Sequence, residues 1–115
     1  SDGFLAEGPG ANLFFEKEGK LFTPQLGNIL PGITRSTVLE LAERLGLEVQ
    51  QGNFTKEDLL QADSAFYCGT AAEVVGIASV DDYQFPKNWN GSLGKKLQNA
   101  YSLLVREPLK QNHFN

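Results

Sequence analysis

Three short segments of the chain combine glycine with side chains that could take part in chemistry: "EGPGANLFF" (residues 7–15), "LPGITR" (30–35) and "CGTAAE" (68–73). The second places Pro-Gly directly before the first turn of a predicted helix, where backbone amides have no intrahelical acceptor. Free amides at the positive end of a helix dipole, together with the Thr34 hydroxyl, would bind an anion. A plain turn leading into a helix has the same composition, so this alternative stays open.

The other two segments could complete such a site. In "CGTAAE" a backbone turn could point the amides of Thr70 and Ala71 outward, which would form a second anion site. Glu7 supplies a carboxylate, although an ordinary exposed acid is an equal alternative from spacing alone. Two anion sites beside one carboxylate would suit a phosphorylated cofactor. Periodicity cannot show that the three segments converge.

The elements that must position these segments follow from the apolar pattern. Strands are predicted at residues 4–6, 13–16, 47–49, 65–70 and 73–80, and "EKEG" before "KLFT" predicts a hairpin turn. Residues 81–91 read as a loop that contains Trp89, which could be a lid, an interface anchor or an exposed aromatic.

Three helices are predicted. The first places Val38, Leu41, Ala42 and Leu45 on one face and closes at Gly46. The second, short helix begins at a capping box formed by Thr55 and Asp58. The third carries an apolar stripe of Leu93, Leu97, Ala100, Tyr101, Leu104 and Val105, and Pro108 is expected to end it, leaving a frayed tail.

Composition limits the classes of function. The chain has 115 residues, a net charge of −4 and a pI near 4.9, which argues against nucleic-acid binding because no basic stripe is present. No apolar run is long enough to span a membrane, and no signal peptide is visible. A metal site is not expected, because His113 is the only histidine. Cys68, the only cysteine, fits a reducing compartment and is expected to be a packing residue rather than a nucleophile.

In their order and spacing these motifs resemble the fold-type IV pyridoxal-phosphate enzymes, most closely the branched-chain amino acid aminotransferases. The resemblance runs from Asp2 to Glu107. In it, "DGFLAEGPGANLFF" is similar to the glutamate strand, "LFTPQLGNILPGITR" to the phosphate loop, "CGTAAE" to the second anion turn and "NGSLGKKLQ" to the entry of the C-terminal helix. "GTAAE" favours the branched-chain group over D-amino acid transaminases and aminodeoxychorismate lyases.

The resemblance implies a mixed α/β fold, with a mixed sheet and flanking helices. Residues 1–108 would be the C-terminal cofactor-binding domain of an aminotransferase and residues 109–115 a tail. The opening "SDGFLAEGPG" and the absence of methionine agree with a fragment or a processed chain that lacks the N-terminal domain.

The resemblance also implies roles for individual residues toward pyridoxal 5'-phosphate. Glu7 would face the pyridine nitrogen, and Leu30 would pack on the ring. Ile33 and Thr34 would hold the phosphate through their amides and the Thr34 hydroxyl. Thr70 would add its hydroxyl to the phosphate, while the amides of Thr70 and Ala71 would meet the substrate carboxylate.

Three neighbouring side chains are assigned on the residues themselves. For Arg35 a structural ion pair is favoured over a contribution to the phosphate site. Asn12 is expected to stabilise a turn. Cys68 is expected to pack in the core.

The Schiff-base lysine of the family lies upstream of the glutamate strand, and none of the seven lysines here occupies such a motif. Lys17 and Lys20 flank a hairpin turn, and Lys95 and Lys96 start a helix. The remaining three are expected to be solvated: Lys56, Lys87 and Lys110. The chain is therefore expected to hold no catalytic residue and to be inactive alone.

The parent protein would transfer an amino group between branched-chain amino acids and 2-oxoglutarate, as a cytoplasmic homodimer with no nucleic-acid or membrane partner. The alternatives are another fold-type IV enzyme, either a D-amino acid transaminase or an aminodeoxychorismate lyase, and a non-catalytic anion-binding module.

Overall fold

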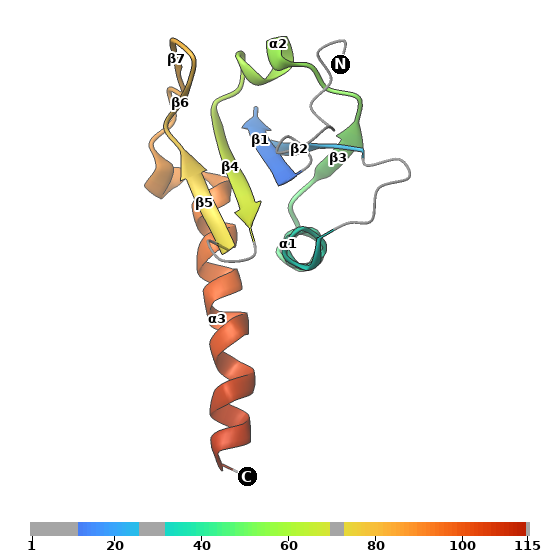
Figure 1. Cartoon of the computed structure of the whole chain (residues 1–115), viewed down its shortest axis with the longest axis vertical. Coiled ribbons are helices and arrows are strands. Elements are labelled where there is room, and N and C mark those ends of the chain that lie inside the picture. The colour runs from blue at the N-terminus through green and yellow to red at the C-terminus, as the bar shows by residue number, and fades with distance from the viewer. Residues whose placement is uncertain (1–11, 26–31, 70–72, 115) are drawn as a thin grey trace.

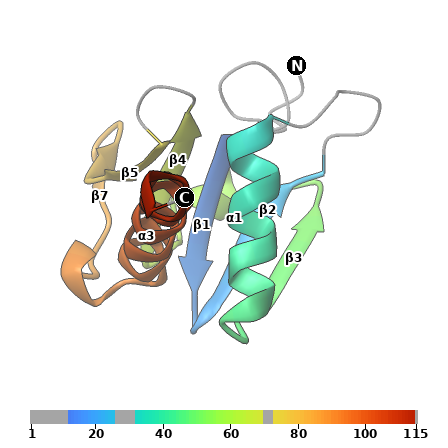
Figure 2. The ribbon, with the colours of Figure 1, turned by 90° about the horizontal axis from the view of Figure 1, so that it is seen from below.

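The computed structural model of the protein describes residues 12–25, 32–69 and 73–114. Within them a five-stranded sheet carries two long helices on one face, so the predicted mixed α/β architecture with flanking helices is confirmed (Figures 1 and 2). The strand predicted at residues 4–6 lies outside the described residues.

The sheet is mixed. Its strands are β1 (Leu13–Lys17), β2 (Lys20–Pro24), β3 (Val49–Gly52), β4 (Ser64–Gly69) and β5 (Glu73–Ile77), in the spatial order β3-β2-β1-β4-β5. β2 and β3 are parallel and are connected through a helix, whereas the other neighbours are antiparallel. This order puts the β4 strand in the interior of the sheet, next to β1.

The turn between β1 and β2 forms as predicted. Glu18 and Gly19 both have positive φ, at 52° and 79°, and Lys17 pairs with Lys20 across them. Two consecutive residues with positive φ make a type I′ turn, whose twist matches that of paired strands.

Helices α1 (Ile33–Arg44) and α3 (Leu93–Phe114) cover the same face of the sheet (Figure 2). Between them and the strands lies the main core, which consists of Phe14, Leu21, Val38, Leu41, Ala42, Phe66, Cys68, Val74 and Leu97. Phe14 and Phe66 are partners in the β1–β4 register, and their rings stack with centroids 4.9 Å apart. Burial of these apolar side chains fixes both helices on the strands.

The opposite face carries a second core, which includes α2 (Lys56–Leu59). Its buried members are Leu13, Phe15, Leu59, Ala62 and Ala65. The side chains of β1 alternate between the two cores, as expected for a strand buried on both faces. The capping box of α2 is present as predicted, because the Thr55 and Asp58 side chains each accept from the other's backbone amide.

The predicted closing residue of α1 is confirmed, whereas the predicted core position of Leu45 and the predicted end of α3 are wrong. α1 closes at Gly46, whose φ is +76°, in a motif where the Leu47 amide donates to Ala42 O at 2.9 Å. That motif turns Leu45 outward, so it is 43% exposed instead of lying in the core. α3 continues through Pro108 to Phe114 instead of ending at the proline: this residue removes one backbone hydrogen bond and crowds the preceding turn, but the residues on both sides of it remain helical.

The predicted loop at residues 81–91 is partly ordered. It contributes one strand of a small hairpin, β6 (Ser79–Val80) with β7 (Tyr83–Gln84), and a 3-10 turn, η2 (Trp89–Gly91). Trp89 is half-buried and packs edge-on against Phe66, with ring centroids 6.3 Å apart. Trp89 is therefore an anchor within the fold itself. None of the helices in the described part of the chain has the length and apolarity to cross a membrane.

Candidate functional site

The N-terminus of α1 lies beside the C-terminal end of β4. Thr34 Oγ1 is 3.5 Å from the carbonyl oxygen of Gly69, to which it donates a long hydrogen bond. A depression of about 280 Å³ at this junction is lined by Asn12, Gly32, Ile33, Thr34, Arg35, Cys68, Gly69 and Tyr101. The described ends of all three glycine-containing segments therefore line one depression.

Among the described residues, no side chain caps the backbone amides at the start of α1. Its N-cap residue, Gly32, offers no side chain to the helix amides, and the first turn holds no acidic residue. The first helical hydrogen bond runs from the Ser36 amide to Gly32 O at 3.1 Å. The amides of Ile33, Thr34 and the following residue consequently have no intrahelical acceptor. This donor set fits a phosphate group, because it presents N–H groups and the positive helix end without a competing carboxylate.

The two predicted phosphate residues in α1 differ in how they could act. The Ile33 side chain is 85% exposed, so its contribution to an anion would come from its amide alone. Thr34 is buried and its hydroxyl lies against β4. Asn12 lines the depression from the end of the first segment, and its Oδ1 is 3.9 Å from the point where a side chain on Gly32 would begin.

The Arg35 side chain is buried between α1 and the sheet. Its Nη2 donates to Pro24 O at 2.7 Å and to Gln51 Oε1 at 3.4 Å. The predicted ion pair of Arg35 is not formed within the described residues, since none of their carboxylates lies within 4.0 Å of the guanidinium. The backbone carbonyl of Pro24, at the end of β2, accepts from the guanidinium instead, because the Arg35 side chain turns inward over the Phe14 ring. Burial lowers the pKa of Arg35, and the nearby Cys68 opposes that shift.

Cys68 is a packing residue, as predicted. Its side chain belongs to the main core, and burial raises the pKa of the thiol to about 12, with the Arg35 charge acting in the opposite direction. The thiol therefore stays protonated at neutral pH and is a poor nucleophile.

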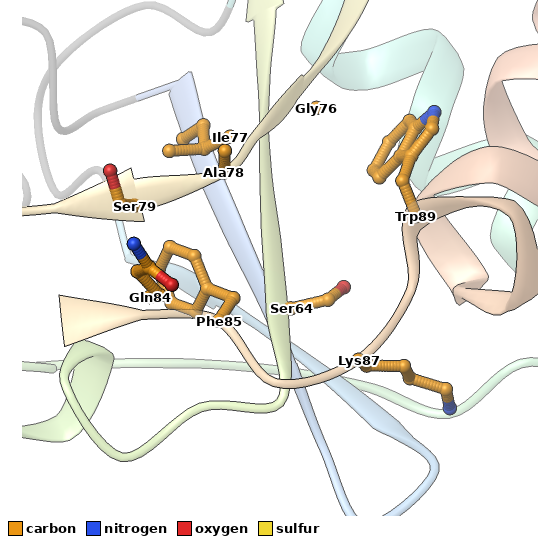
Figure 3. A pocket seen from close by; sticks show the side chains of 9 residues that line it. All are labelled: Ser64, Gly76, Ile77, Ala78, Ser79, Gln84, Phe85, Lys87 and Trp89. Atoms are coloured by element: carbon orange, nitrogen blue, oxygen red, sulfur yellow. The ribbon is translucent and has the colours of Figure 1, made fainter.

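A larger cavity, of about 660 Å³, lies at the opposite end of β4 (Figure 3). It is lined by Ser64, Gly76, Ile77, Ala78, Ser79, Gln84, Phe85, Lys87 and Trp89. β4 begins at Ser64 and ends at Gly69, so the strand separates this cavity from the depression at α1. None of the three glycine-containing segments contributes a described residue to its lining.

Beside that cavity the structure holds a buried carboxylate that the sequence analysis missed. Glu16, 1% exposed, accepts hydrogen bonds from Lys87 Nζ at 2.5 Å and from the Leu93 amide, the first of α3, at 2.9 Å. Lys87 was predicted to be solvated, and its side chain is 39% exposed, but its ammonium group also pairs with the buried Glu16, which the prediction missed. The available signal was strand alternation, which places position 16 on the inward face together with Phe14.

Comparison with known proteins supports one family. A sequence model of the family "Amino-transferase class IV" matches residues 1–80, which contain all three glycine-containing segments. The branched-chain-amino-acid aminotransferase of Escherichia coli K12 is 43% identical over 101 residues, which are 87% of this chain and 33% of that protein. The enzyme of the same name from Pseudomonas aeruginosa is 41% identical over 104 residues, 90% of this chain and 34% of that protein.

A solved structure agrees with this. The branched-chain amino acid aminotransferase from Thermobaculum terrenum, in its PLP form (holo form), superposes with a TM-score of 0.81 at 42% identity. The match covers 90% of this chain and 34% of that one. This chain belongs to the class IV aminotransferases. It spans about a third of the length of the relatives that it matches.

Several residues to which the family resemblance assigns a role in binding the cofactor or the substrate lie outside the described part of the chain. They are Glu7, Leu30, Thr70 and Ala71. Their assigned roles stay predictions, as do those of Ile33 and Thr34. No lysine of the described residues lines the depression at α1. Within the same residues, no group of three or more histidine, cysteine, aspartate or glutamate side chains is placed to hold a metal ion.

Proposed function

We propose that this chain is the phosphate-binding part of a branched-chain aminotransferase that uses pyridoxal 5'-phosphate. The observation that carries the proposal is the depression where the uncapped start of α1 meets the end of β4. The similarity to branched-chain aminotransferases at 41–43% identity favours this specificity over a D-amino acid transaminase or an aminodeoxychorismate lyase.

In this proposal the chain's own residues bind and orient the cofactor and the substrate. The amides of Ile33 and Thr34 and the hydroxyls of Thr34 and Thr70 bind the phosphate, which fixes the cofactor at one end. Leu30 packs on the ring, and Glu7 holds a proton on the pyridine nitrogen. When bound, pyridoxal phosphate supplies an electron-withdrawing ring that stabilises negative charge at the substrate α-carbon.

The substrate is oriented at the second turn. The amides of Thr70 and Ala71 donate hydrogen bonds to the substrate carboxylate, which places the amino group toward the cofactor. The lysine that binds the cofactor covalently, and that moves the proton during transfer, is proposed to come from a segment outside this chain. Leucine, isoleucine or valine would be the amino donor and 2-oxoglutarate the acceptor, in a cytoplasmic homodimer.

Transamination by the full-length protein that contains this chain tests the proposal. We expect amino transfer from leucine to 2-oxoglutarate, and a loss of turnover in Glu7→Gln because ring protonation weakens. Thr34→Ala should mainly weaken cofactor retention, by about 1.5–3 kcal/mol for one charge-assisted contact. Thr37→Ala is the matched control, since Thr37 lies one turn later and its hydroxyl donates to Ile33 O. Full activity without pyridoxal phosphate, or equal cofactor affinity in both threonine variants, would contradict the proposal.

A further inference from the structure

The Arg35 guanidinium has a position that its two hydrogen bonds do not fully explain. The residue is 3% exposed, and its Nε has no hydrogen-bond partner within the described part of the chain. Its two acceptors, Pro24 O and Gln51 Oε1, are neutral. A buried cation normally sits beside an anion, because removing a charge from water is costly without one. Among the described residues the Phe14 ring, 6.0 Å from Arg35 Cζ, offsets part of this cost, and no carboxylate lies within 4.0 Å of the guanidinium.

The same side chain joins the two stems of the phosphate loop. Arg35 is in the first turn of α1, where the loop ends, and Pro24 is the last residue of β2, from which the loop departs. Its hydrogen bond to Pro24 O, at 2.7 Å, therefore joins two residues that are 11 positions apart and closes the loop between them. The bond to Gln51 adds the neighbouring strand β3 to this clamp. The start of α1 is consequently held at a fixed place relative to the sheet.

Arg35 also lines the depression at the start of α1, together with Thr34 and Gly69. We propose that Arg35 is a positioning residue of the phosphate site, and that the phosphate group of the ligand is the counter-charge of its buried guanidinium. The inference rests on the proposed function, because it needs a phosphorylated ligand at α1. It assigns to Arg35 two effects: it fixes the amides of Ile33 and Thr34, and it keeps the phosphate doubly charged.

The second effect separates this role from simple packing. A nearby fixed positive charge favours the dianionic form of a phosphate, whose second pKa is otherwise about 6. With Arg35 present, the phosphate should stay dianionic across the range from about pH 6 to 8. Without it, the phosphate should titrate within this range. A residue that only filled the core would not change the ionisation of a bound phosphate.

The experiment compares three variants of the full-length protein: Arg35→Met, Arg35→Lys and Arg44→Met. Arg44 is the matched control, since it lies at the exposed end of the same helix, where it pairs with Glu40 at 3.4 Å. Dissociation constants for pyridoxal phosphate and for unphosphorylated pyridoxal are measured with each variant. Phosphorus NMR of bound pyridoxal phosphate is then recorded against pH.

We expect Arg35→Met to weaken pyridoxal phosphate roughly tenfold or more while changing pyridoxal affinity little, because only the phosphate carries the counter-charge. Its phosphorus signal should become pH-dependent, and Arg35→Lys should recover part of both effects. Arg44→Met should match the unmodified protein. Equal weakening of both ligands, or a pH-independent phosphorus signal in Arg35→Met, would overturn the inference.

The measurements also distinguish failure of the inference about Arg35 from misfolding of a variant and from failure of the proposed function. If Arg35→Met does not fold, Arg35→Lys decides: it keeps the charge, so a phosphorus signal that titrates fully between about pH 6 and 8 in this variant would overturn the inference. If the unmodified protein binds pyridoxal phosphate no more tightly than pyridoxal, the phosphate site itself is wrong. If it prefers the phosphorylated ligand and the Arg35 variants retain the full preference, only the inference about Arg35 fails.

Discussion

Breaking the buried ion pair of Glu16 should cost far more stability than breaking an exposed pair. In Lys87→Met the Glu16 carboxylate, which is 1% exposed in the unmodified protein, keeps only the Leu93 amide at 2.9 Å and a long contact from Ser64 at 3.5 Å. An unpaired buried charge costs about 3–5 kcal/mol, but the Lys87 side chain is 39% exposed, so water can replace part of it. We expect a loss of about 2–3 kcal/mol in the free energy of unfolding.

The control is Lys20→Met, which breaks the Lys20–Glu48 pair at 3.8 Å, where both side chains are about half exposed. That change should cost less than about 0.5 kcal/mol. Urea unfolding, followed by circular dichroism, gives both values on the same scale. If Lys87→Met costs no more than Lys20→Met, the assignment of Glu16 as a buried, ionised anchor of α3 is wrong.

Two further predictions concern packing and pH. Gly94→Ala should destabilise the fold by about 1–3 kcal/mol or prevent folding, because its Cβ would lie 2.5 Å from the Trp89 ring. The matched change Gly91→Ala places a Cβ with no atom within 4 Å, so it should be near neutral. Thermal unfolding measures both. The pKa of Cys68 is raised from 9.0 to about 12, so its contribution to stability is complete below pH 9.0 and is lost as pH rises to about 12. The free energy of unfolding should therefore fall more steeply over this range in the unmodified protein than in Cys68→Ala. Equal slopes in the two proteins would contradict the pKa shift.

The elements with strong local signals could be predicted from the sequence. The Glu18–Gly19 turn, the capping box of Thr55 and the closing Gly46 each depend on a few neighbouring residues, and the structure has all three. The mixed sheet followed from the family resemblance rather than from periodicity. The pairing of β2 with β3 joins strands separated by a helix, which a local pattern does not encode.

The features that could not be predicted depend on contacts between distant residues. The burial of Arg35 needs the end of β2, and that of Glu16 needs Lys87 and Leu93, more than 70 positions away along the chain. When a charged residue is considered without its distant neighbours, its side chain is therefore predicted to be exposed to solvent or to form a surface ion pair. The same holds for the meeting of Thr34 with Gly69, 35 positions apart, which spacing alone could not show.

The central claim is that the start of α1 binds the phosphate of pyridoxal phosphate. The most direct measurement is an NMR titration of the full-length protein, labelled with nitrogen-15 at isoleucine and threonine, with pyridoxal phosphate and separately with pyridoxal. The account predicts that the Ile33 and Thr34 amide signals shift downfield with pyridoxal phosphate, as expected for amides that donate to an anion, and shift much less with pyridoxal. The Thr37 amide, one turn later, should respond weakly to both. Equal responses of Ile33 and Thr34 to the two ligands, or no response to pyridoxal phosphate, would contradict the claim.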